Sequence, residues 1–457
     1  MQILPLMVIG TGCRFAFPQE VTMTGSLRAY ATRSLGFFLL AICVSTASAQ
    51  TTYTITDLGT LGDNPFSFGF SLNGVGQVTG SSNNLGSIGN HGFLYSAGTM
   101  TDLGVLDPDP ADLRTFSVGR GINESGQVTG TATAKIDGVT EPHAFVYSQG
   151  TMQDLGTLGG NTSNGYGIND SGEVTGSADL AGNTGTHAFL YSNGQTHDLG
   201  TLPGYDGSTG LGINNAGQVT GFLSATGTTH AFLYSGGQIT DLGTLGGSLS
   251  QGSAINRYGQ IAGGSTLVPN TQYVGATHAF LYSGGKMRDL GTLGGTSSYA
   301  FGINSFGQVV GWSDTRSGVV HAFLYTPGRG MLDLNRLLPR GSEIVLSGAA
   351  AINDAGQITG GATVASGAIH AFLLSPPPSV MLTNLIRSYQ LPRAVAHSLE
   401  TKLRSARSAN VGSGAYCSGL DEFTGKVQSL VGTYLTTAQA AQLITVAGQL
   451  RSSANCY

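Results

Sequence analysis

The stretch HAFLYSGGQITDLGTLGG, residues 230–247, decides the fold, because close copies of it recur along the chain. Within it, two short runs, HAFLYS and QITDLG, flank a Gly-Gly pair. Short alternating runs on either side of such a pair predict an antiparallel β-hairpin. In that hairpin Phe232 would face Asp241, and His230 would lie diagonally from Asp241 on the same face.

Three motifs recur seven times each, at spacings of 42 to 52 residues. The Asp of Asp-Leu-Gly, or of its variant, stands at Asp57, Asp102, Asp154, Asp198, Asp241, Asp289 and Asp333. The Asn of Ile-Asn or Leu-Asn stands at Asn73, Asn123, Asn169, Asn214, Asn256, Asn304 and Asn353. The motif His-Ala-Phe, or a variant of it, begins at His91, His143, His187, His230, His278, His321 and His370. Self-similarity at such a period is typical of repeat architectures.

Each period contains four strand-like runs, arranged as two hairpins with tight Gly- and Asn-bearing turns. The repeats begin with a lone fourth run at residues 52–59 and end with the first three runs at Ser375. A ring in which the first strand completes the last sheet accounts for both ends. The sequence therefore predicts an all-β fold, a seven-bladed β-propeller closed by the N-terminal strand, followed by a small α-helical bundle. A β-solenoid, the alternative, fits less well because its coils tolerate less variation in length and need caps at both ends.

The copies resemble the HAF-type extracellular repeat family of bacteria, named for the His-Ala-Phe tripeptide, over residues 52–375. HAFLYS, DLGTLGG, GIN and GQVTG occur together and in order. The sequence departs from the pattern at Gly92, where Ala is usual, at Val146, where Leu is usual, and at Asn335, which replaces the Gly after Asp-Leu. The resemblance implies an exported location and no assigned chemistry.

The ends of the chain differ in composition from the repeats. Residues 1–22 are interpreted as an upstream extension, and residues 23–49 have the basic start, apolar run and small-residue end of a secretory signal peptide. The mature chain would begin at Gln50; a genuine long leader or a membrane anchor is the alternative. Residues 50–375 form the predicted propeller, 376–379 a Pro-rich linker, and 380–457 a helical C-terminal domain.

Helical periodicity supports that last domain. The predicted apolar faces are Val395, Leu399, Leu403 and Ala406, and Phe423, Val427, Leu430 and Tyr434. Thr436 and Gln439 form a capping box, and a disulfide is expected between Cys417 and Cys456 in an exported chain. In LPRAVAHSLETKLRSA and LTTAQAAQLI the segment is similar to the bacterial FIMAH domain, although FTGKVQS departs from that family's name motif. The similarity implies an accessory or attachment module.

The repeated His–Asp pairs are interpreted as structural contacts that satisfy buried polar groups between strands. The residues assigned to this role are His143, His187, His230, His278, His321 and His370, with Asp154, Asp198, Asp241, Asp289 and Asp333. A shared metal is excluded by distance, because equivalent positions in adjacent blades would lie about 13 Å apart, whereas zinc binds its nitrogen ligands at about 2.1 Å. Seven equivalent pairs without a local nucleophile also argue against catalysis.

Function is therefore sought in the connections whose length varies between copies, which would all lie on one face of the propeller. The candidate binding residues there are Asp107, Asp109, Asp112, Tyr205, Asp206, Trp312, Asp314 and Arg316. The first three could hold Ca²⁺ through carboxylate oxygens, although they lack EF-hand spacing, and a solvated Pro-stiffened loop is the alternative. Trp312 could stack on a sugar or act as a wedge between blades.

Composition narrows the class of partner. The formal net charge is −5, charged residues make up 10% of the chain, and no basic patch with interleaved aromatics occurs, so nucleic acid is not expected as a partner. No second apolar stretch predicts a transmembrane segment, and no phosphate-binding, sialidase or hydrolase motif is found.

These observations predict an exported, non-catalytic binding or interaction protein, without a cofactor, whose variable face engages a polysaccharide or a cell-surface partner. A propeller enzyme that acts on polysaccharide, a glycosidase or lyase, is the first alternative. It would need two carboxylates from non-equivalent loops, such as Asp107 to Asp112 with Asp206 or Asp314. A structural envelope or matrix protein is the second alternative.

Overall fold

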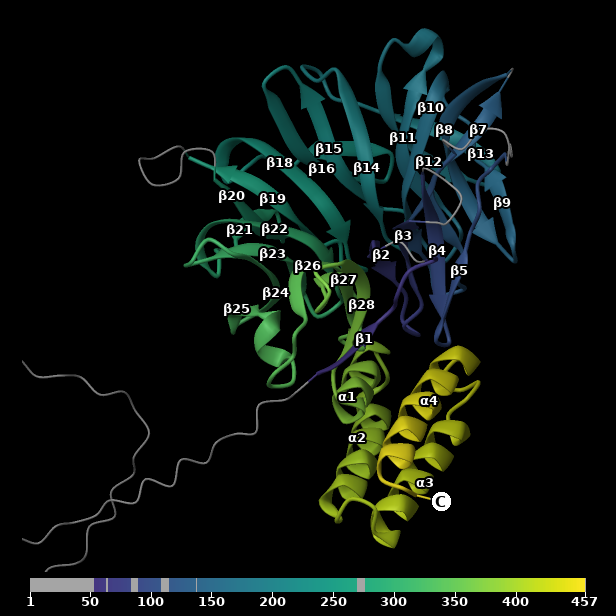
Figure 1. Cartoon of the computed structure of the whole chain (residues 1–457), viewed down its shortest axis with the longest axis vertical. Helices are drawn as coiled ribbons and strands as arrows, with labels where there is room; N and C mark the ends of the chain where they lie inside the picture. Colours follow the sequence, from purple (N-terminus) through teal and green to yellow (C-terminus); the bar gives the residue numbers. More distant parts are fainter. Residues whose placement is uncertain are drawn as a thin grey trace, which may run out of the picture. The chain divides into compact units, whose positions relative to one another are not determined.

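The computed structural model describes residues 53–62, 65–83, 89–107, 115–136, 138–268 and 276–456. The predicted upstream extension (1–22), the signal peptide (23–49) and Gln50 lie outside the described residues. The described part is mostly β, with four-stranded antiparallel sheets, and ends in a helical region (Figure 1). No helix within it is both long and apolar enough to cross a bilayer.

The strands follow the repeats. They are β1 (Thr54–Asp57), β2 (Ser67–Leu72), β3 (Val78–Asn83), β4 (Asn90–Ser96), β5 (Thr99–Asp102), β6 (Ser117–Ile122), β7 (Val128–Ile136), β8 (Val139–Ser148), β9 (Thr151–Asp154), β10 (Gly159–Ile168), β11 (Val174–Leu180), β12 (Thr186–Ser192), β13 (Gln195–Gly200) and β14 (Gly207–Ile213). They continue as β15 (Val219–Ala225), β16 (Thr228–Ser235), β17 (Gln238–Asp241), β18 (Gly246–Ile255), β19 (Ile261–Leu267), β20 (Thr277–Ser283), β21 (Lys286–Asp289), β22 (Gly294–Ile303), β23 (Val309–Thr315), β24 (Val320–Thr326), β25 (Gly330–Asp333), β26 (Val345–Ile352), β27 (Ile358–Thr363) and β28 (Ile369–Ser375). Two short 3-10 helices, η1 (Ala181–Asn183) and η2 (Leu334–Leu337), interrupt them.

Antiparallel pairing joins the strands of each repeat in chain order, as in β2-β3-β4-β5. One sheet has eight strands because a parallel pairing at one residue pair, Thr229 with Leu249, links the four strands of one repeat to those of the next. Another sheet has the order β1-β28-β27-β26, so the N-terminal strand lies beside the last strand of the β region. Its register runs from Thr54 opposite Ser375 to Asp57 opposite Phe372.

The first strand of each repeat contacts the first strand of the next: β2, β6, β10, β14, β18, β22 and β26, with β26 contacting β2. A chain of hydrogen bonds follows the same cyclic order. The side-chain amide of Asn73 donates to the backbone carbonyl of Asn123, and the motif Asn of each later repeat does the same to its neighbour. Asn353 donates back to Asn73, with an N–O distance of 3.0 Å. The invariant Asn thus connects consecutive repeats.

Other repeated residues pack the sheets. The Phe of each His-Ala-Phe motif is fully buried, and these residues are Phe93, Phe145, Phe189, Phe232, Phe280, Phe323 and Phe372. In most repeats a Thr in the second strand donates to the carbonyl of that Phe, as Thr220 does to Phe232 at 2.8 Å. Gly221 follows Thr220, and a Cβ there would lie 1.8 Å from the Thr209 carbonyl oxygen. Only glycine therefore permits this approach of the first two strands.

The helices are α1 (Pro378–Ser388), α2 (Arg393–Ser408), α3 (Gly414–Ser429) and α4 (Thr437–Ser453). The predicted linker 376–379 is too long, because Pro378 and Ser379 already belong to α1; proline is preorganised for the first helical position. The capping box of Thr436 and Gln439 is present at the start of α4.

The predicted apolar faces are mostly buried, but α3 ends at Ser429, so Tyr434 lies beyond it and is 47% exposed. Cys417 in α3 and Cys456 after α4 form a disulfide. The disulfide links the start of α3 to the segment just after α4. Both helices also contribute residues to the apolar core of this region.

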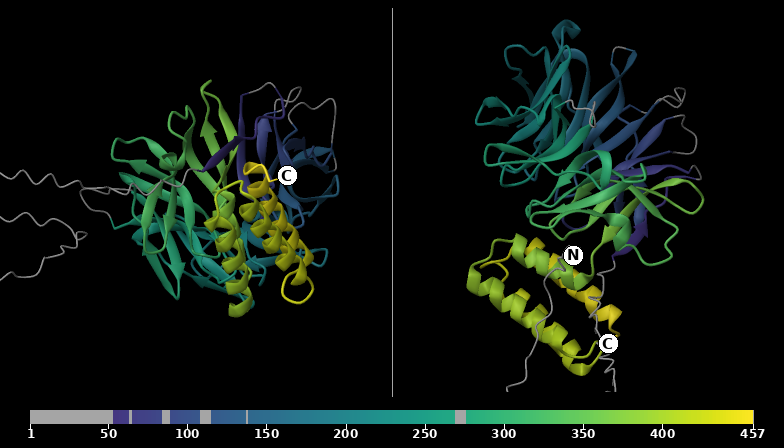
Figure 2. Two further views of the ribbon diagram at one scale, coloured as in Figure 1. Left: turned by 90° about the horizontal axis from the view of Figure 1, so that it is seen from below. Right: turned by 90° about the vertical axis from the view of Figure 1, so that its left-hand side faces the viewer.

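Helices α1 and α4 contact the turns that join the first two strands of three repeats. Asn384 of α1 donates to the carbonyl of Ala355 at 3.1 Å, and Gln442 of α4 donates to the carbonyl of Gly74. Gln390, just after α1, donates to the hydroxyl of Tyr258 at 2.7 Å. Ala355 is also part of the apolar cluster of the helices. Figure 2 shows the helices from two further sides.

Candidate functional site

Each repeated His contacts the carboxylate of a repeated Asp. The Nδ1 to carboxylate distance is 2.8 to 2.9 Å in the pairs His91–Asp102, His143–Asp154, His187–Asp198, His230–Asp241, His278–Asp289, His321–Asp333 and His370–Asp57. The hairpin register is the predicted one, with Phe232 opposite Asp241. An ionised carboxylate only accepts, so Nδ1–H is the donor. The last pair joins the N-terminal strand to β28.

The same Asp also shapes the turn that follows it. Asp241 Oδ1 accepts from the backbone N–H of Gly243 at 2.8 Å, and Gly243 has φ of 68°. This left-handed conformation favours glycine and explains the motif Asp-Leu-Gly. In the last copy Asn335 replaces the glycine, and Asp333 instead caps η2.

The His143–Asp154 pair has perturbed pKa values on both sides. The hydrogen bond from His143 to Asp154 raises the pKa of the imidazole against the effect of burial. His143 Nε2 also donates to the carbonyl of Asn161 at 3.1 Å, and an imidazole that donates from both nitrogens is protonated. Burial acts to raise the pKa of Asp154, but the hydrogen bonds from His143 and Gly156 outweigh it and lower that pKa.

These shifts predict a pH-dependent contribution to stability. Because the pKa of His143 is raised in the folded state, its protonated form stabilises the fold. This contribution to the free energy of unfolding is present in full below the ordinary pKa of about 6.5, and it is lost as pH rises through the folded-state pKa. We expect His143→Asn to lower the free energy of unfolding by about 1 kcal/mol more at pH 5.5 than at pH 8.5, because hydrogen bonds of charged groups are stronger than neutral ones. Thermal unfolding at both values checks this, with Thr240→Ala on an exposed strand position as the control. An equal loss at both pH values would contradict the assignment of a protonated His143.

The predicted binding residues are dispersed. Asp107 is exposed, whereas Asp109 and Asp112 lie outside the described residues. Among the residues with a described position, no group of three or more His, Cys, Asp or Glu could hold a metal ion. Asp206 is exposed after Tyr205, and Arg316 is exposed in the turn after β23.

Three of these residues make contacts within the β region. The Tyr205 hydroxyl donates to Asp241 Oδ2 at 2.7 Å, and burial together with that hydrogen bond raises the pKa of Tyr205 to about 12. Trp312 lies inside β23, paired with Tyr299 and Ala322, and not on a connecting loop. Asp314 accepts from Thr296 and from the backbone of Ser297.

A different set of side chains points into the space between the first strands. In every repeat the pairing of the first and second strands skips the third residue before the motif Asn, as Tyr166 is skipped between Gly165 and Gly167. Such a β-bulge leaves one residue unpaired and redirects its side chain. We call these the bulge residues: Phe70, Arg120, Tyr166, Leu211, Ser253, Phe301 and Ala350.

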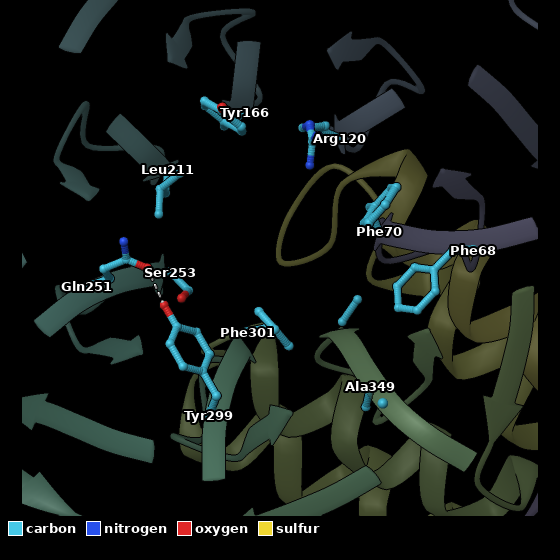
Figure 3. Close-up of a pocket in the computed structure, with 12 residues that line it drawn as sticks. Phe68, Phe70, Arg120, Tyr166, Leu211, Gln251, Ser253, Tyr299, Phe301 and Ala349 are labelled. Atoms are coloured by element: carbon cyan, nitrogen blue, oxygen red, sulfur yellow. Dashed lines mark hydrogen bonds between the residues drawn. The ribbon is translucent and has the colours of Figure 1, made fainter. Parts of the chain in front are cut away.

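All seven bulge residues line one cavity of 340 Å³, here called the channel cavity. Phe68, Gln251, Tyr299, Gly348 and Ala349, which lie one or two positions earlier in their strands, complete its wall. Figure 3 shows these side chains around a central space. The volume lies near the lower end of the range of about 300 to 1,000 Å³ found for small-molecule sites.

Aromatic rings and one cation dominate the wall. The Arg120 guanidinium carbon lies 5.3 Å from the ring centroids of both Phe70 and Tyr166, within cation–π range. Phe301 is 41% exposed, and its ring centroid is 5.0 Å from that of Tyr299. The Tyr299 hydroxyl donates to Gln251 at 2.8 Å.

Two further cavities continue from the channel cavity toward the helices. A cavity of 320 Å³ shares the bulge residues and is also lined by the aliphatic residues that precede the motif Asn: Leu72, Ile122, Ile168, Ile213, Ile255, Ile303 and Ile352. A cavity of 570 Å³ shares three of these aliphatic side chains and is lined beyond them by the turns and by α1 and α4. The channel cavity therefore lies at the end remote from the helices.

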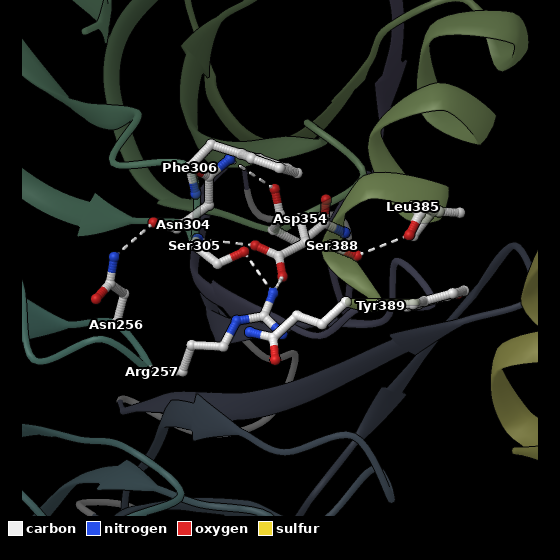
Figure 4. A network of polar contacts seen from close by, with 12 residues as sticks. Asn256, Arg257, Asn304, Ser305, Phe306, Asp354, Leu385, Ser388 and Tyr389 are labelled. Carbon is white, nitrogen blue, oxygen red and sulfur yellow. Dashed lines mark hydrogen bonds and ion pairs between the residues drawn. The ribbon is translucent and has the colours of Figure 1, made fainter. Parts of the chain in front are cut away.

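The helix-side end is polar. Arg257 donates to both Asp354 and Ser305 at 2.5 Å, close to Tyr389 of the helical region (Figure 4). Burial raises the pKa of Glu124, which also accepts from the backbone of Gly74 at 2.8 Å. The two ends of the channel thus differ in chemistry, with an aromatic and cationic end and an end rich in carboxylates.

Variation in loop length does not reveal the channel cavity, because the residues that line it lie within strands. A signal was present inside the repeats: the residue in Gly-x-Gly-Ile-Asn and its variants differs greatly between copies whose neighbours are nearly constant. A position that varies within a constant strand motif is free of the packing that fixes its neighbours.

No protein-family model matches the sequence, and no curated protein matches it. Among solved structures, the chain is similar to a protein from Agrobacterium tumefaciens assigned as TolB, at 14% identity and a TM-score of 0.38, over 61% of this chain and 94% of that one. TolB from Acinetobacter baumannii is 11% identical with a TM-score of 0.35, over 63% and 76%. A variant of the Aleuria aurantia lectin in complex with Fucα1-6GlcNAc is 12% identical with a TM-score of 0.33, over 62% and 94%.

Proposed function

We propose that this chain is an exported, non-catalytic binding protein of the HAF-repeat type. Its β region is a seven-bladed propeller closed by β1, and it binds a polysaccharide or a cell-surface glycan through the channel cavity. The cyclic order of the motif Asn hydrogen bonds and the pairing of β1 with β28 support the closed ring. The Cys417–Cys456 disulfide and the signal-like segment 23–49 support export. The helical region, similar to FIMAH, would serve as an attachment module.

One observation carries the location of the site. Around the cyclic set of first strands, the residues that bond neighbouring repeats are nearly constant, while the bulge residues change from Ala350 and Ser253 to Phe301 and Arg120. Symmetric packing requires the constant positions, whereas recognition of an asymmetric ligand requires different groups around one cavity. Aromatic faces with a few polar groups are the usual lining of a small-molecule site.

The composition of the wall favours binding over hydrolysis. Among the residues that the structure describes, those that line the channel cavity include no Asp, Glu, His or Cys. Glycoside hydrolysis by the common mechanisms needs two carboxyl groups on either side of the scissile bond. The wall described here supplies stacking surfaces and hydrogen bonds instead.

A cavity-filling variant tests the site. We expect Ala350→Phe to weaken binding of every glycan that the full chain recognises on an array of bacterial and plant polysaccharides by at least tenfold. The equivalent positions already hold Phe70 and Phe301, so a phenylalanine fits the local backbone while its ring occupies the cavity. Dissociation constants measured for the hits check this.

Thr240→Phe adds the same side chain at an exposed position of the outer strand β17 and serves as the matched control. Both variants should melt within a few degrees of the parent chain. Unchanged affinity of a correctly folded Ala350→Phe protein would move recognition away from the channel cavity and return it to the connecting loops.

A further inference from the structure

We infer that the channel cavity selects an acidic sugar unit at the end of a glycan, and that Arg120 is the residue that binds its negative group. This inference rests on the proposed function and adds the chemical class of the ligand. Arg120 is one of seven bulge residues, and the other six are uncharged. Among the described residues it is therefore the one charged side chain of the cavity wall.

Two cation–π contacts flank the Arg120 guanidinium. Phe70 and Tyr166 lie on either side of it, each with its ring centroid 5.3 Å from the guanidinium carbon. Such contacts with the ring faces use none of the N–H donors of the guanidinium. The surrounding bulge residues Leu211 and Ala350 are apolar, so they offer no side-chain acceptor.

Hydrogen bonding around Arg120 is incomplete. Its Nε is buried without a hydrogen-bond partner, and within the described ranges no carboxylate forms an ion pair with it. Arginine stays charged at any physiological pH, so burial of an unpaired Nε–H donor costs free energy. A ligand oxygen that accepts a hydrogen bond from the guanidinium would remove that cost. A planar carboxylate can accept two parallel hydrogen bonds from the N–H groups of the guanidinium.

The depth of the cavity indicates which part of a glycan enters. On the helix side of the bulge residues, seven aliphatic side chains line the channel, including Leu72 and Ile303. These side chains cannot replace the water around a charged or hydroxylated group. Beyond them the helix-side cavity contains Glu124, Asp170 and Asp354 with one cation, Arg257, which is paired with Asp354, so the remaining carboxylates repel an anion. An acidic sugar is therefore stopped at the level of Arg120, and the cavity accepts a chain end.

The remaining wall fits the body of a sugar. Phe301 offers an exposed ring face for the apolar side of a pyranose, and Gln251 and Ser253 offer polar groups on the neighbouring wall (Figure 3). The same anionic chemistry occurs in uronic acids, through a carboxylate, and in sulfated sugars, through a sulfate ester. The two sources are separated by the choice of ligand.

Isothermal titration of the full chain with six matched sugars tests the inference. The set is the methyl glycoside of glucuronic acid, of glucose and of glucose 6-sulfate, and the same three compounds in the galacto series. We expect at least one acidic sugar to bind at least tenfold more tightly than its neutral counterpart. Preference for the uronate identifies a carboxylate ligand, and preference for the 6-sulfate identifies a sulfate ester.

Variants of Arg120 assign the effect to this residue. Arg120→Gln should weaken binding of the acidic sugar at least tenfold and change binding of the neutral sugar less than twofold, because only the acid uses the charge. Arg120→Lys keeps the positive charge but lacks the planar set of guanidinium N–H donors, so it should give an intermediate affinity. Arg288→Gln, which removes an exposed arginine from the outer strand β21, is the control and should change nothing. Melting temperatures confirm that each variant is folded.

Failure of the inference is distinguishable from failure of the proposed function. If neutral glycans bind as well as acidic ones, and Ala350→Phe abolishes binding while Arg120→Gln does not, the cavity binds glycans but the acidic selectivity is wrong. If acidic sugars bind and neither variant affects them, the site lies elsewhere and both proposals are overturned. Binding of none of the six sugars overturns the ligand class.

Discussion

Deletion of residues 50–59 is expected to cost the β region at least about 5 kcal/mol of unfolding free energy, an amount comparable to the whole stability of many domains. The deletion removes β1 and Leu58, which is 6% exposed in the apolar cluster around Phe93. It also leaves β28 without its outer partner and His370 without Asp57. Exposed strand edges template aggregation, so the yield of soluble protein should fall as well.

The measurement is thermal and denaturant unfolding of the deleted chain beside the full chain. Asp57→Asn is the matched variant, because it keeps the strand and changes only the carboxylate that contacts His370 and the backbone N–H of Gly59; we expect it to lose about 1 kcal/mol. Addition of a synthetic peptide of residues 50–61 should restore part of the lost stability. A deleted chain that melts with the full chain would show that β1 does not close the ring.

Gly221→Ala should lower the free energy of unfolding by about 3 kcal/mol or more. The added Cβ would stand 1.8 Å from the carbonyl oxygen of Thr209 and 2.9 Å from its carbonyl carbon, and both are backbone atoms that cannot move aside without separating two strands. Gly221 has no left-handed backbone conformation, so the cost comes from contact and not from φ. Urea unfolding gives the free energy directly.

Gly348→Ala is the matched control for that variant. Gly348 also lies in a strand of the β region, and a Cβ there meets nothing within 4 Å. We expect a change within about 0.5 kcal/mol of the parent chain. Equal losses in the two variants would mean that loss of glycine flexibility, and not the close approach of β14 and β15, determines the effect.

Local signals in the sequence were sufficient to predict the hairpins. The Gly-Gly turn and the alternating residues of 230–247 predicted the register in which Phe232 faces Asp241, and the structure has that register. Contacts between His and Asp followed from the same register, since strand pairing fixes which side chains share a face. The phase of the repeats placed β1 next to β28 for an equally simple reason: the last repeat lacked a fourth strand, and the repeats began with a spare one.

The cavity could not be found in the same way. Alternation along a strand predicts two faces, but the bulge at Tyr166 and its equivalents breaks the alternation and turns one residue toward the channel. Trp312 was misplaced for a related reason, since β23 extends past Gly311 to Thr315 and contains Trp312 in its middle. Loop length, the criterion used for the binding residues, does not report how far strands extend.

The pairing of β1 with β28 also has a kinetic consequence. His370 and Asp57 are 313 residues apart in the sequence, whereas the two strands of a hairpin such as β16–β17 are neighbours. Local hairpins form within microseconds, and contacts of high sequence separation form late. During synthesis β1 emerges first and waits for the last repeat, so the edge that it covers stays exposed until the end of folding. The pairing of β1 with β28 is therefore the step of folding before which an exposed strand edge leaves this protein most open to aggregation.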